Sequence, residues 1–241
     1  MSEGMTIAWC DNGLVDGRFM QGVTDVMLYG GVKVTNTLRS NGNQIARQRE
    51  RVITVWYEQN KSDWILWVDS DVVISPQTFK MLWDAKDAEK RPIVTGVYFT
   101  SDTPEESLMV PWPTLYNWTP DKGKLARIHP MPKNQIIKVG AAGMGFVLMH
   151  RSAVTQIIEK LGNVRLFAEL YGENTFTGED IYFYSLCDRA DVPVYAHTGA
   201  TVPHMKRFSF DEVYYDSYVM ATTKPAQTQL HSKKNTKKKG K

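Results

Sequence analysis

The sequence predicts an α/β fold: a mostly parallel sheet with helices on both faces, followed by a smaller layer. The first hundred residues alternate strand-like and helix-like segments in the order β-α-β-α-β-α-β. The run WILWVD at 64–69 is apolar almost without interruption, which is typical of a strand covered on both faces. After residue 100 this alternation stops, because prolines at 104, 111, 113, 120, 130 and 132 interrupt the chain.

The first half of the chain is expected to contain four strands and three helices. Strands are predicted at 6–10, 32–38, 64–69 and 92–98, and helices at 17–29, at 43–59 and from Pro76 onward. Asn43 is a favourable N-cap for the second helix, and Ser75 is the expected cap of the third. The second helix carries one apolar face and, on another face, two arginines one turn apart: Ile45, Val52, Ile53 and Trp56, then Arg47 and Arg51.

The second half is predicted to form a hairpin, two further strands and two helices. TLYNW (114–118) and KLARIH (124–129) suit the hairpin, while GAAGMGFVLMH (140–150) and VPVYAH (192–197) suit strands. Helices are predicted at 152–161 and 179–190. Thr177 and Asp180 have nearly the spacing of a capping box at the start of the last helix. The apolar stripe of that helix comprises Phe183, Leu186, Cys187 and Ala190.

Composition and charge favour one globular domain at 1–223 and a basic tail at 224–241. The chain has 241 residues, 42% of them hydrophobic, which is enough for a sizeable core. Its formal net charge is +3; subtracting the seven lysines from Lys224 onward leaves −4 for residues 1–223. We expect the tail to be disordered and to act as a solubilising end, or to contact an anionic surface or nucleic acid.

Several classes of protein are disfavoured by what the sequence lacks. No apolar run approaches the roughly 18 residues of a membrane span, and the first residues do not resemble a signal peptide. The two cysteines, Cys10 and Cys187, form neither a disulfide framework nor a metal motif. A cytoplasmic protein is therefore expected, and its oligomeric state stays open.

Two carboxylates follow the third predicted strand. In open α/β sheets, ligands bind outside the carboxyl ends of the strands, where Asp69 and Asp71 are expected. Ser75 already caps the next helix, so these acids are not needed as caps. Two ionised neighbours repel each other unless a cation is present, and hard oxygen ligands favour Mg²⁺ or Mn²⁺. The pair therefore indicates a divalent metal site, with solvated loop acids as the alternative.

Six segments in order resemble glycosyltransferases of the GT-A fold, especially those of the family 2 type. The Asp-x-Asp segment is WILWVDSDVVISPQTFKML (64–82), preceded by NGNQIARQRERVI (41–53) and followed by PIVTGVYFT (92–100). GAAGMGFVLMHRSAV (140–154) is similar to the family's glycine-rich strand, and TGEDIYFYSLCDRADVPVYAH (177–197) to its Glu-Asp motif. VPH (202–204) has the position of a late metal-binding histidine. The resemblance covers residues 5–210.

The resemblance implies metal-dependent transfer of a sugar from a nucleotide-sugar, with a UDP-sugar favoured, to an unknown acceptor hydroxyl, with inversion. By resemblance Asp71 binds Mn²⁺ or Mg²⁺ directly, and Asp69 binds it through water or holds the ribose. His204 is the implied third ligand, with His197 as the competing histidine. Asp180 takes the proton of the acceptor hydroxyl as general base, and Glu179 binds acceptor hydroxyls.

The remaining candidate residues are expected around the donor. Asp11 and Asn12, after the first strand, are placed to hydrogen-bond a pyrimidine edge. In the Pro-rich middle, Trp112, Tyr116 and Trp118 form a sugar-stacking platform, a mobile lid or local core. Asn43 and Arg47 are expected to contact the base or the diphosphate, with a surface helix position as the alternative for Arg47, and Ser70 is a further expected donor contact. Gly96 and Gly143 would allow close approach of the backbone to the sugar or the acceptor, with tight strand packing as the alternative.

Two other functions stay open. A metal-dependent nucleotidyltransferase also uses Asp-x-Asp, although CDNGLVDGR (10–18) lacks the lysine of its usual phosphate loop. A non-catalytic sugar- or nucleic-acid-binding module on the same fold is the second alternative. The lysine tail is the only feature of the sequence that favours nucleic acid as the ligand. A basic tail by itself gives mostly salt-sensitive, non-specific binding.

Overall fold

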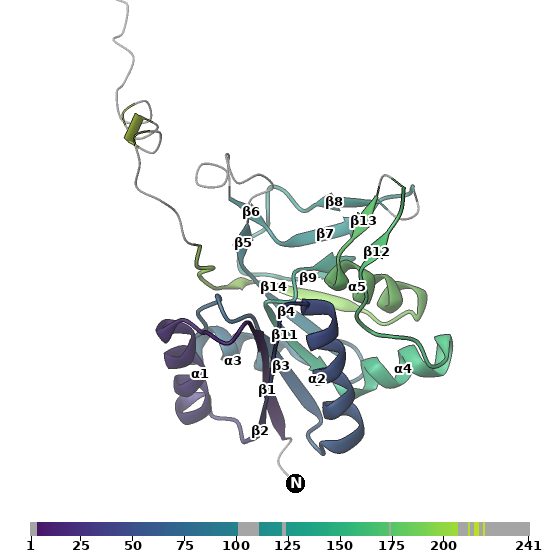
Figure 1. The fold of residues 1–241 in the computed structure, drawn as a ribbon, viewed down its shortest axis with the longest axis horizontal. Coiled ribbons are helices and arrows are strands. Elements are labelled where there is room, and N and C mark those ends of the chain that lie inside the picture. Colours follow the sequence, from purple (N-terminus) through teal and green to yellow (C-terminus); the bar gives the residue numbers. More distant parts are fainter. Residues whose placement is uncertain are drawn as a thin grey trace, which may run out of the picture. The chain divides into compact units, whose positions relative to one another are not determined.

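The centre of the molecule is a seven-stranded sheet in the order β2-β1-β3-β11-β4-β14-β9 (Figure 1). The computed structural model describes residues 4–100, 111–121, 124–173 and 175–206, together with 212, 215, 216 and 219. β11 and β9 run antiparallel to their neighbours, and the other five strands point the same way. The strands are β1 (Met5–Asp11), β2 (Val34–Asn41), β3 (Trp64–Val68), β4 (Ile93–Val97), β9 (Ile136–Val139), β11 (Phe146–His150) and β14 (Val194–Thr201).

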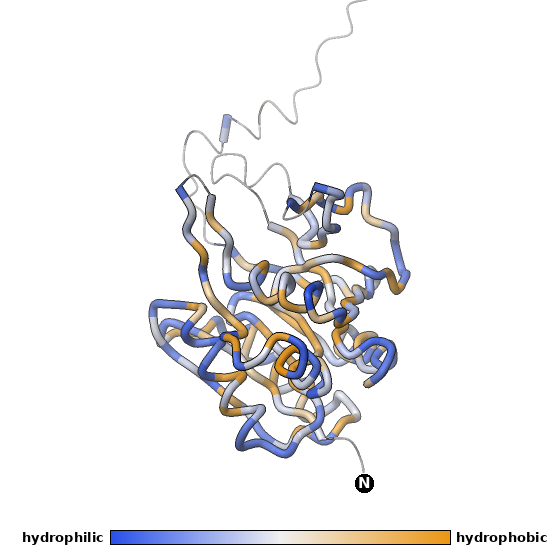
Figure 2. The backbone as a smooth tube through the Cα atoms, turned by 90° about the vertical axis from the view of Figure 1, so that its right-hand side faces the viewer, coloured by the Kyte–Doolittle hydropathy of each residue, from blue (hydrophilic) through white to orange (hydrophobic). Residues whose placement is uncertain are grey.

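Helices cover both faces of this sheet, as the sequence predicts. Along β3, Trp64, Leu66 and Val68 pack toward α1 and α3, while Ile65 and Trp67 pack toward α2, α4 and α5. Both sides of β3 are therefore buried, and Figure 2 shows hydrophobic stretches running through the inside of the fold. The helices are α1 (Gly17–Tyr29), α2 (Ile45–Gln59), α3 (Pro76–Ala85), α4 (Arg151–Leu161) and α5 (Glu179–Arg189).

Short strands form a smaller layer beside the central sheet (Figure 1). β7 (Leu115–Trp118) pairs with both β8 (Leu125–Arg127) and β10 (Ala141–Ala142). β5 (Phe99–Thr100) pairs with β6 (Trp112–Pro113), and β12 (Leu170–Tyr171) with β13 (Phe176–Thr177). The predicted hairpin of 114–118 and 124–129 is confirmed by the β7–β8 pair.

The helix starts show which local predictions hold. At α3, Ser75 and Thr78 form a reciprocal capping box with Pro76 in the first turn, so the predicted cap is confirmed. At α2 the predicted cap is wrong, because the helix begins at Ile45 and Gln44 occupies the N-cap position without a side-chain cap. The helix at 17–29 is confirmed with the same bounds.

Two predictions for the second half need correction. The segment 140–150 is not one strand: Ala141–Ala142 belongs to the small sheet and Phe146–His150 to the central one. At α5 the N-cap is Gly178 and no side chain caps the helix, so the capping box of Thr177 and Asp180 is absent. The structure also contains β9, an edge strand paired with β14 that the sequence did not predict.

The chain divides into two compact units, Met1–Met205 and Lys206–Lys241. The first unit contains every strand and helix named above. Within the part of the chain that the structure describes, no helix has the length and apolarity needed to span a bilayer. The lysines of the predicted tail, from Lys224 onward, lie outside the described residues.

Candidate active site

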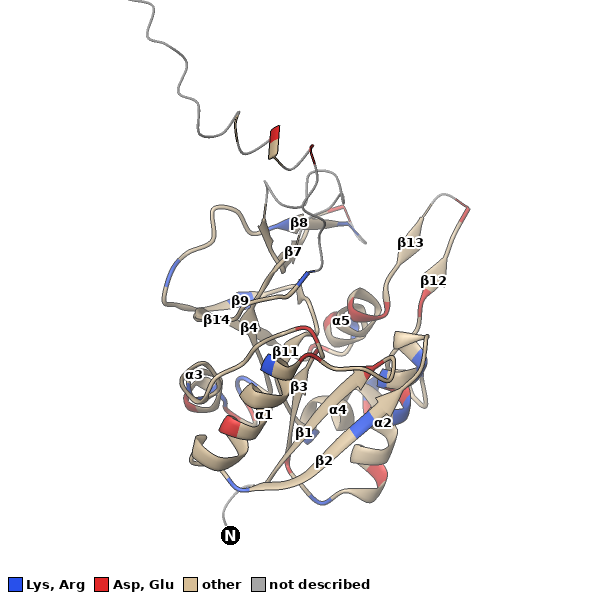
Figure 3. Cartoon of the chain, turned by 60° about the vertical axis from the view of Figure 1, so that its left-hand side comes forward, with Lys and Arg blue, Asp and Glu red and all other residues tan. Residues whose placement is uncertain are grey.

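The candidate site lies at the carboxyl ends of β1 and β3, close to the starts of α2 and α5. Acidic residues gather at this edge of the sheet, while basic residues follow α2 (Figure 3). β1 ends at Asp11 and β3 ends one residue before Asp69. Parallel strands bring these ends to the same edge, where open α/β sheets bind their ligands.

Asp11 is held in place by four hydrogen bonds within the protein. Its Oδ1 accepts from the Gly13 backbone N–H at 2.7 Å and from Arg39 Nη2 at 2.8 Å. Its Oδ2 accepts from Trp9 Nε1 at 3.1 Å and from Arg39 Nε at 2.6 Å. Hydrogen bonds from Arg39 keep the pKa of Asp11 below its ordinary value. All four acceptor positions of this carboxylate are therefore used in fixing the loop that carries Asn12.

A buried arginine joins two acidic parts of the site. Arg49 Nη2 donates to Asp69 Oδ1 at 2.7 Å, and Arg49 Nη1 donates to Glu179 Oε1 at 2.5 Å. The Arg49 side chain is only 5% exposed. A guanidinium fork with one carboxylate on each nitrogen fixes the end of β3 relative to the start of α5.

Asp180 lies next to this cluster in a half-buried position. Burial raises the pKa of Asp180, while the charge of Arg49 opposes that rise. Its Oδ1 accepts the backbone N–H of Ile181 at 2.7 Å, and among the described residues nothing hydrogen-bonds its Oδ2. Burial likewise raises the pKa of Glu179, again opposed by Arg49. Asp180 thus keeps an oxygen available to a ligand.

Asp71 and His204 meet although 133 residues separate them in the chain. Backbone hydrogen bonds from Val73 to Pro203 and from Met205 to Asp71 place the two segments side by side. His204 Nδ1 lies 2.9 Å from the Phe99 carbonyl oxygen and must donate its proton there, since a carbonyl only accepts. His204 Nε2 lies 3.1 Å from Asp71 Oδ2. In the neutral ring this nitrogen carries a lone pair, so nitrogen and carboxylate together favour a cation.

This pair fits a divalent metal. A metal-binding histidine usually donates its other ring N–H to a carbonyl or carboxylate, as His204 does to Phe99. Neighbouring ligands of an octahedral ion, each about 2.1 Å from it, are about 3 Å apart, which matches the 3.1 Å between the two side chains. Among the described residues, no three His, Cys, Asp or Glu side chains are grouped closely enough to hold a metal by themselves. A site of this kind takes its remaining ligands from water and substrate phosphates.

A cavity of about 570 Å³ opens beside Asp71. Residues from the ends of β1 and β3 and from the loop before α2 line this cavity. Burial raises the pKa of Cys10, at one wall, to about 12, so its thiol is uncharged at neutral pH. Of the predicted donor contacts, this cavity is lined by Asp11, Asn12, Asn43, Ser70 and Asp71.

Other predicted residues lie elsewhere. Gly96 packs against the Phe146 ring and the Ala200 carbonyl, and Gly143 packs against the Tyr98 hydroxyl, so both permit close packing. Arg47 is exposed on α2 and does not line the cavity beside Asp71. His197 is on β14, where its Nδ1 accepts the Gly199 N–H at 3.1 Å, and His204 is the histidine beside Asp71.

The aromatic residues of the Pro-rich segment pack around one arginine. Arg127 lies over the rings of Trp112 and Tyr116, 5.5 Å from each centroid. Trp118 and Tyr116 are partly buried against the main core. These contacts agree with the local-core interpretation of this segment.

Arg49 is the site residue that sequence reasoning missed. The helical spacing singles out Arg47 and Arg51 on this helix, whereas Arg49 between them is the arginine that is buried and paired with two carboxylates. One signal was present: in the predicted helix, Arg49 lies three or four residues from the apolar Ile45, Val52 and Ile53.

Comparisons with known proteins show what the fold resembles. No protein-family model and no curated protein matches the chain. Among solved structures, A197 from STIV is 21% identical with a TM-score of 0.50, over 84% of this chain and 86% of that one. GalNAc-T7, solved with UDP, GalNAc and Mn²⁺, is 10% identical with a TM-score of 0.53. That match covers 86% of this chain, which spans only 45% of the GalNAc-T7 chain. The protein therefore has a GT-A-like α/β fold, as its sequence predicted.

Proposed function

We propose that this protein is a metal-dependent glycosyltransferase that moves a sugar from a nucleotide-sugar to an acceptor hydroxyl, with inversion. The observation that carries the proposal is the contact of His204 with Asp71, which lines the donor-sized cavity at the strand ends. Its nitrogen and oxygen suit a divalent ion with open positions for a diphosphate. The similarity to GalNAc-T7, a structure that contains UDP and Mn²⁺, supports this proposal at the level of the fold.

The cavity beside Asp71 is the proposed binding site of the donor. Asp71 and His204 are the residues that would hold Mn²⁺ or Mg²⁺, which would stabilise the charge on the nucleoside diphosphate leaving group. Asn12 and Asn43 offer amide groups to the nucleobase, and Asp11 fixes the loop from which Asn12 projects. Asp69, held by Arg49, would bind the ribose or a water on the metal. A pyrimidine nucleotide, and a UDP-sugar in particular, is the favoured donor.

The residues proposed to act on the acceptor lie at the start of α5. Asp180 has an oxygen without a partner among the described residues, and it takes the proton from the acceptor hydroxyl as that hydroxyl attacks the anomeric carbon. Burial raises the pKa of Asp180, which makes it a stronger base than an ordinary aspartate. Glu179, which Arg49 orients, binds hydroxyls of the acceptor.

Donor hydrolysis is the first test, because many transferases pass sugar to water when no acceptor is present. The protein is incubated with UDP-, GDP-, CMP- and dTDP-sugars in Mn²⁺, Mg²⁺ or EDTA, and released nucleotide is measured. Asp84→Ala, which removes an exposed carboxylate on α3, is the matched control for Asp71→Ala. We expect metal-dependent release from one donor, retained in Asp84→Ala and lost in Asp71→Ala.

Two additions separate the alternatives: a reaction with a nucleoside triphosphate and a sugar phosphate, and a measurement of ligand binding. A nucleotidyltransferase would instead form a nucleotide-sugar from a nucleoside triphosphate and a sugar phosphate, with release of pyrophosphate. A binding module would bind ligand without turnover in any metal. If no donor releases nucleotide and no nucleotide binds in a metal-dependent way, the transferase proposal is refuted. Asp180→Asn should bind the donor normally and transfer no sugar; transfer at the parent rate would exclude Asp180 as the base.

A further inference from the structure

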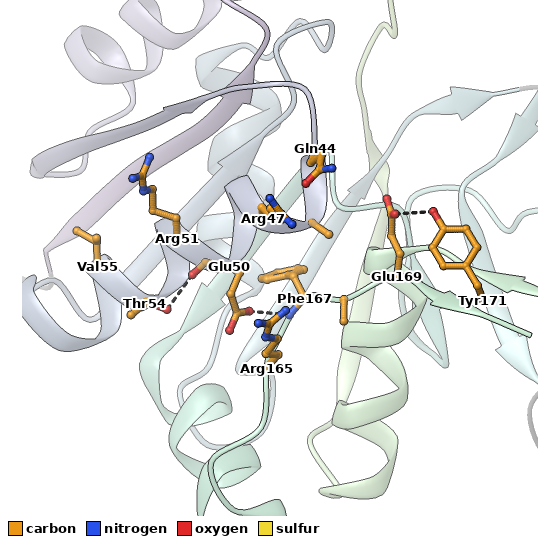
Figure 4. Close-up of a pocket in the computed structure, with 12 residues that line it drawn as sticks. Gln44, Arg47, Glu50, Arg51, Thr54, Val55, Arg165, Phe167, Glu169 and Tyr171 are labelled. Atoms are coloured by element: carbon orange, nitrogen blue, oxygen red, sulfur yellow. Dashed lines mark hydrogen bonds between the residues drawn. The ribbon is translucent and has the colours of Figure 1, made fainter.

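A second cavity, of about 750 Å³, lies between α2 and the segment 165–171 that follows α4 (Figure 4). We call it the arginine groove. Arg47 and Arg51 border it from α2, and Arg165 borders it from the opposite segment. The buried ring of Phe167 and the exposed ring of Tyr171 contribute apolar surface. The groove thus combines three guanidinium groups with one accessible aromatic face.

The three arginines have no charge partner among the described residues, whereas the two acids of the groove are engaged. All three side chains belong to exposed residues, and none makes a hydrogen bond or ion pair within the described structure. Glu50 Oε2 accepts the backbone N–H groups of Leu166 and Phe167 at 2.9 and 2.8 Å. Glu169 Oε2 accepts the Tyr171 hydroxyl at 2.8 Å. Glu50 therefore holds the wall of the groove in place and does not pair with the neighbouring arginines.

The positions of Arg47 and Arg51 add a further reason for an anionic ligand. They are four residues apart on α2, so their like charges face the same side of the helix and repel. An anion between them and Arg165 removes this repulsion. Guanidinium groups bind carboxylate and phosphate oxygens through paired N–H donors, and such charge-assisted hydrogen bonds are among the strong ones.

The arginine groove adjoins the donor cavity. Gln44 and Glu169 line both of them, so a ligand in the groove reaches toward the edge where Asp71 lies. Arg49, on the helix that borders the groove, donates to Glu179, the residue before the proposed base Asp180. A molecule that occupies the groove thus lies next to the proposed donor cavity.

We propose that the arginine groove binds the acceptor, and that the acceptor is a small sugar or oligosaccharide bearing carboxylate or phosphate groups. This inference rests on the proposed transferase function and names the substrate class of the same site. A volume of about 750 Å³ is typical of pockets for small molecules. Tyr171, 76% exposed, offers one ring face for a sugar, whereas single-stranded nucleic acid binds along several aromatic side chains.

Direct binding tests this proposal with three probes. Trigalacturonate carries three carboxylates, maltotriose is a neutral trisaccharide of similar size, and a short single-stranded oligodeoxynucleotide represents nucleic acid. Binding to the full chain is measured by calorimetry with saturating UDP and Mn²⁺, so that the donor cavity is filled. The variant Arg51→Gln/Arg165→Gln removes one guanidinium from each side of the groove. Arg18→Gln/Arg189→Gln removes two exposed arginines elsewhere and is the matched control.

We expect saturable binding of trigalacturonate, at least tenfold weaker binding of maltotriose, and a loss of at least tenfold in Arg51→Gln/Arg165→Gln. The control variant should stay within twofold of the parent. No saturable binding of trigalacturonate would overturn the proposal. So would an equal loss in both double variants, which would show general charge attraction, or tighter binding of the oligodeoxynucleotide that depends on Arg51 and Arg165.

The donor hydrolysis assay, run in parallel, separates this inference from the proposed function. If nucleotide release from the donor depends on metal and trigalacturonate does not bind, the groove assignment fails and the transferase proposal stands. If trigalacturonate binds through Arg51 and Arg165 and no nucleotide binds with metal, the groove is an anionic sugar site and the transferase proposal fails.

Discussion

At the scale of single residues, the site depends on Arg49, whose side chain is 5% exposed and contacts two carboxylates. Burying a charge is unfavourable unless it is paired, and removing one member of a buried pair leaves the other uncompensated. Arg49 therefore has two effects: it stabilises the fold locally, and its positive charge keeps Asp180 and Glu179 more acidic than burial alone would.

The first prediction concerns Arg49→Gln. We expect the free energy of unfolding to fall by about 3 kcal/mol, because Asp69 and Glu179 lose their shared partner. The pKa of Asp180 should also rise further, since the opposing charge is gone. The acid limb of the pH profile of kcat/KM should therefore move to higher pH. This shift distinguishes an electrostatic role of Arg49 from a purely structural one, which urea unfolding alone would report. Arg189→Gln, an exposed change on α5, is the control. An unshifted acid limb would restrict Arg49 to a structural role.

The second prediction concerns Asp180→Asn and stability. Burial raises the folded-state pKa of Asp180 above its unfolded value, so the folded protein binds this proton more tightly. The resulting stabilisation is complete below the unfolded pKa and is lost as pH rises through the folded pKa. Asparagine cannot ionise, so the variant does not suffer this loss. In EDTA, its melting temperature should exceed that of the parent at pH 7, and the difference should shrink toward pH 3.5. A less stable variant at pH 7 would contradict this account.

At the scale of elements, the site requires close approach of α1 to the segment before α3. Gly22 is buried in α1, and a Cβ there would meet the backbone carbonyl of Ile74. At Gly17, the start of the same helix, no atom of the described residues lies within 4 Å of such a Cβ. Ile74 is three residues from Asp71, so this contact supports the loop that carries the proposed metal ligand.

The third prediction uses these two glycines as a matched pair. Gly22→Ala should lower the free energy of unfolding by about 1–3 kcal/mol, because the overpacking outweighs the gain in helix propensity. Gly17→Ala should leave stability unchanged or slightly higher. Urea unfolding of both variants checks the prediction. Equal midpoints for the two variants would show that α1 is free to move away from Ile74.

Local sequence patterns predicted elements better than their junctions. The helix at 17–29 and the Ser75 cap follow from periodicity and capping chemistry within a few residues. Asn43 has the chemistry of a cap, yet α2 begins two residues later, and tertiary contacts decide between such close alternatives. β9 is four residues long and exists through its pairing with β14, more than fifty residues away. Such long-range pairing has no local signal.

At the scale of the whole molecule, the sheet order decides which residues meet. β11 inserts antiparallel between β3 and β4, and the segment after β14 returns to bring His204 beside Asp71. The alternation of strands and helices predicted the class of fold and put Asp69 and Asp71 at a sheet edge. It did not predict the partner of either acid. His204 was expected through family resemblance, and Arg49 was missed because Glu179 lies 130 residues away in sequence.

The most direct test of the account is Mn²⁺ binding in the presence of UDP, measured by electron paramagnetic resonance on the full chain. Asp71→Ala and His204→Ala should each weaken Mn²⁺ binding by at least about tenfold. His197→Ala, which changes a histidine bonded to the Gly199 N–H on β14, should bind Mn²⁺ like the parent. Equal affinity in all four proteins, or a loss confined to His197→Ala, would contradict a metal site at Asp71 and His204.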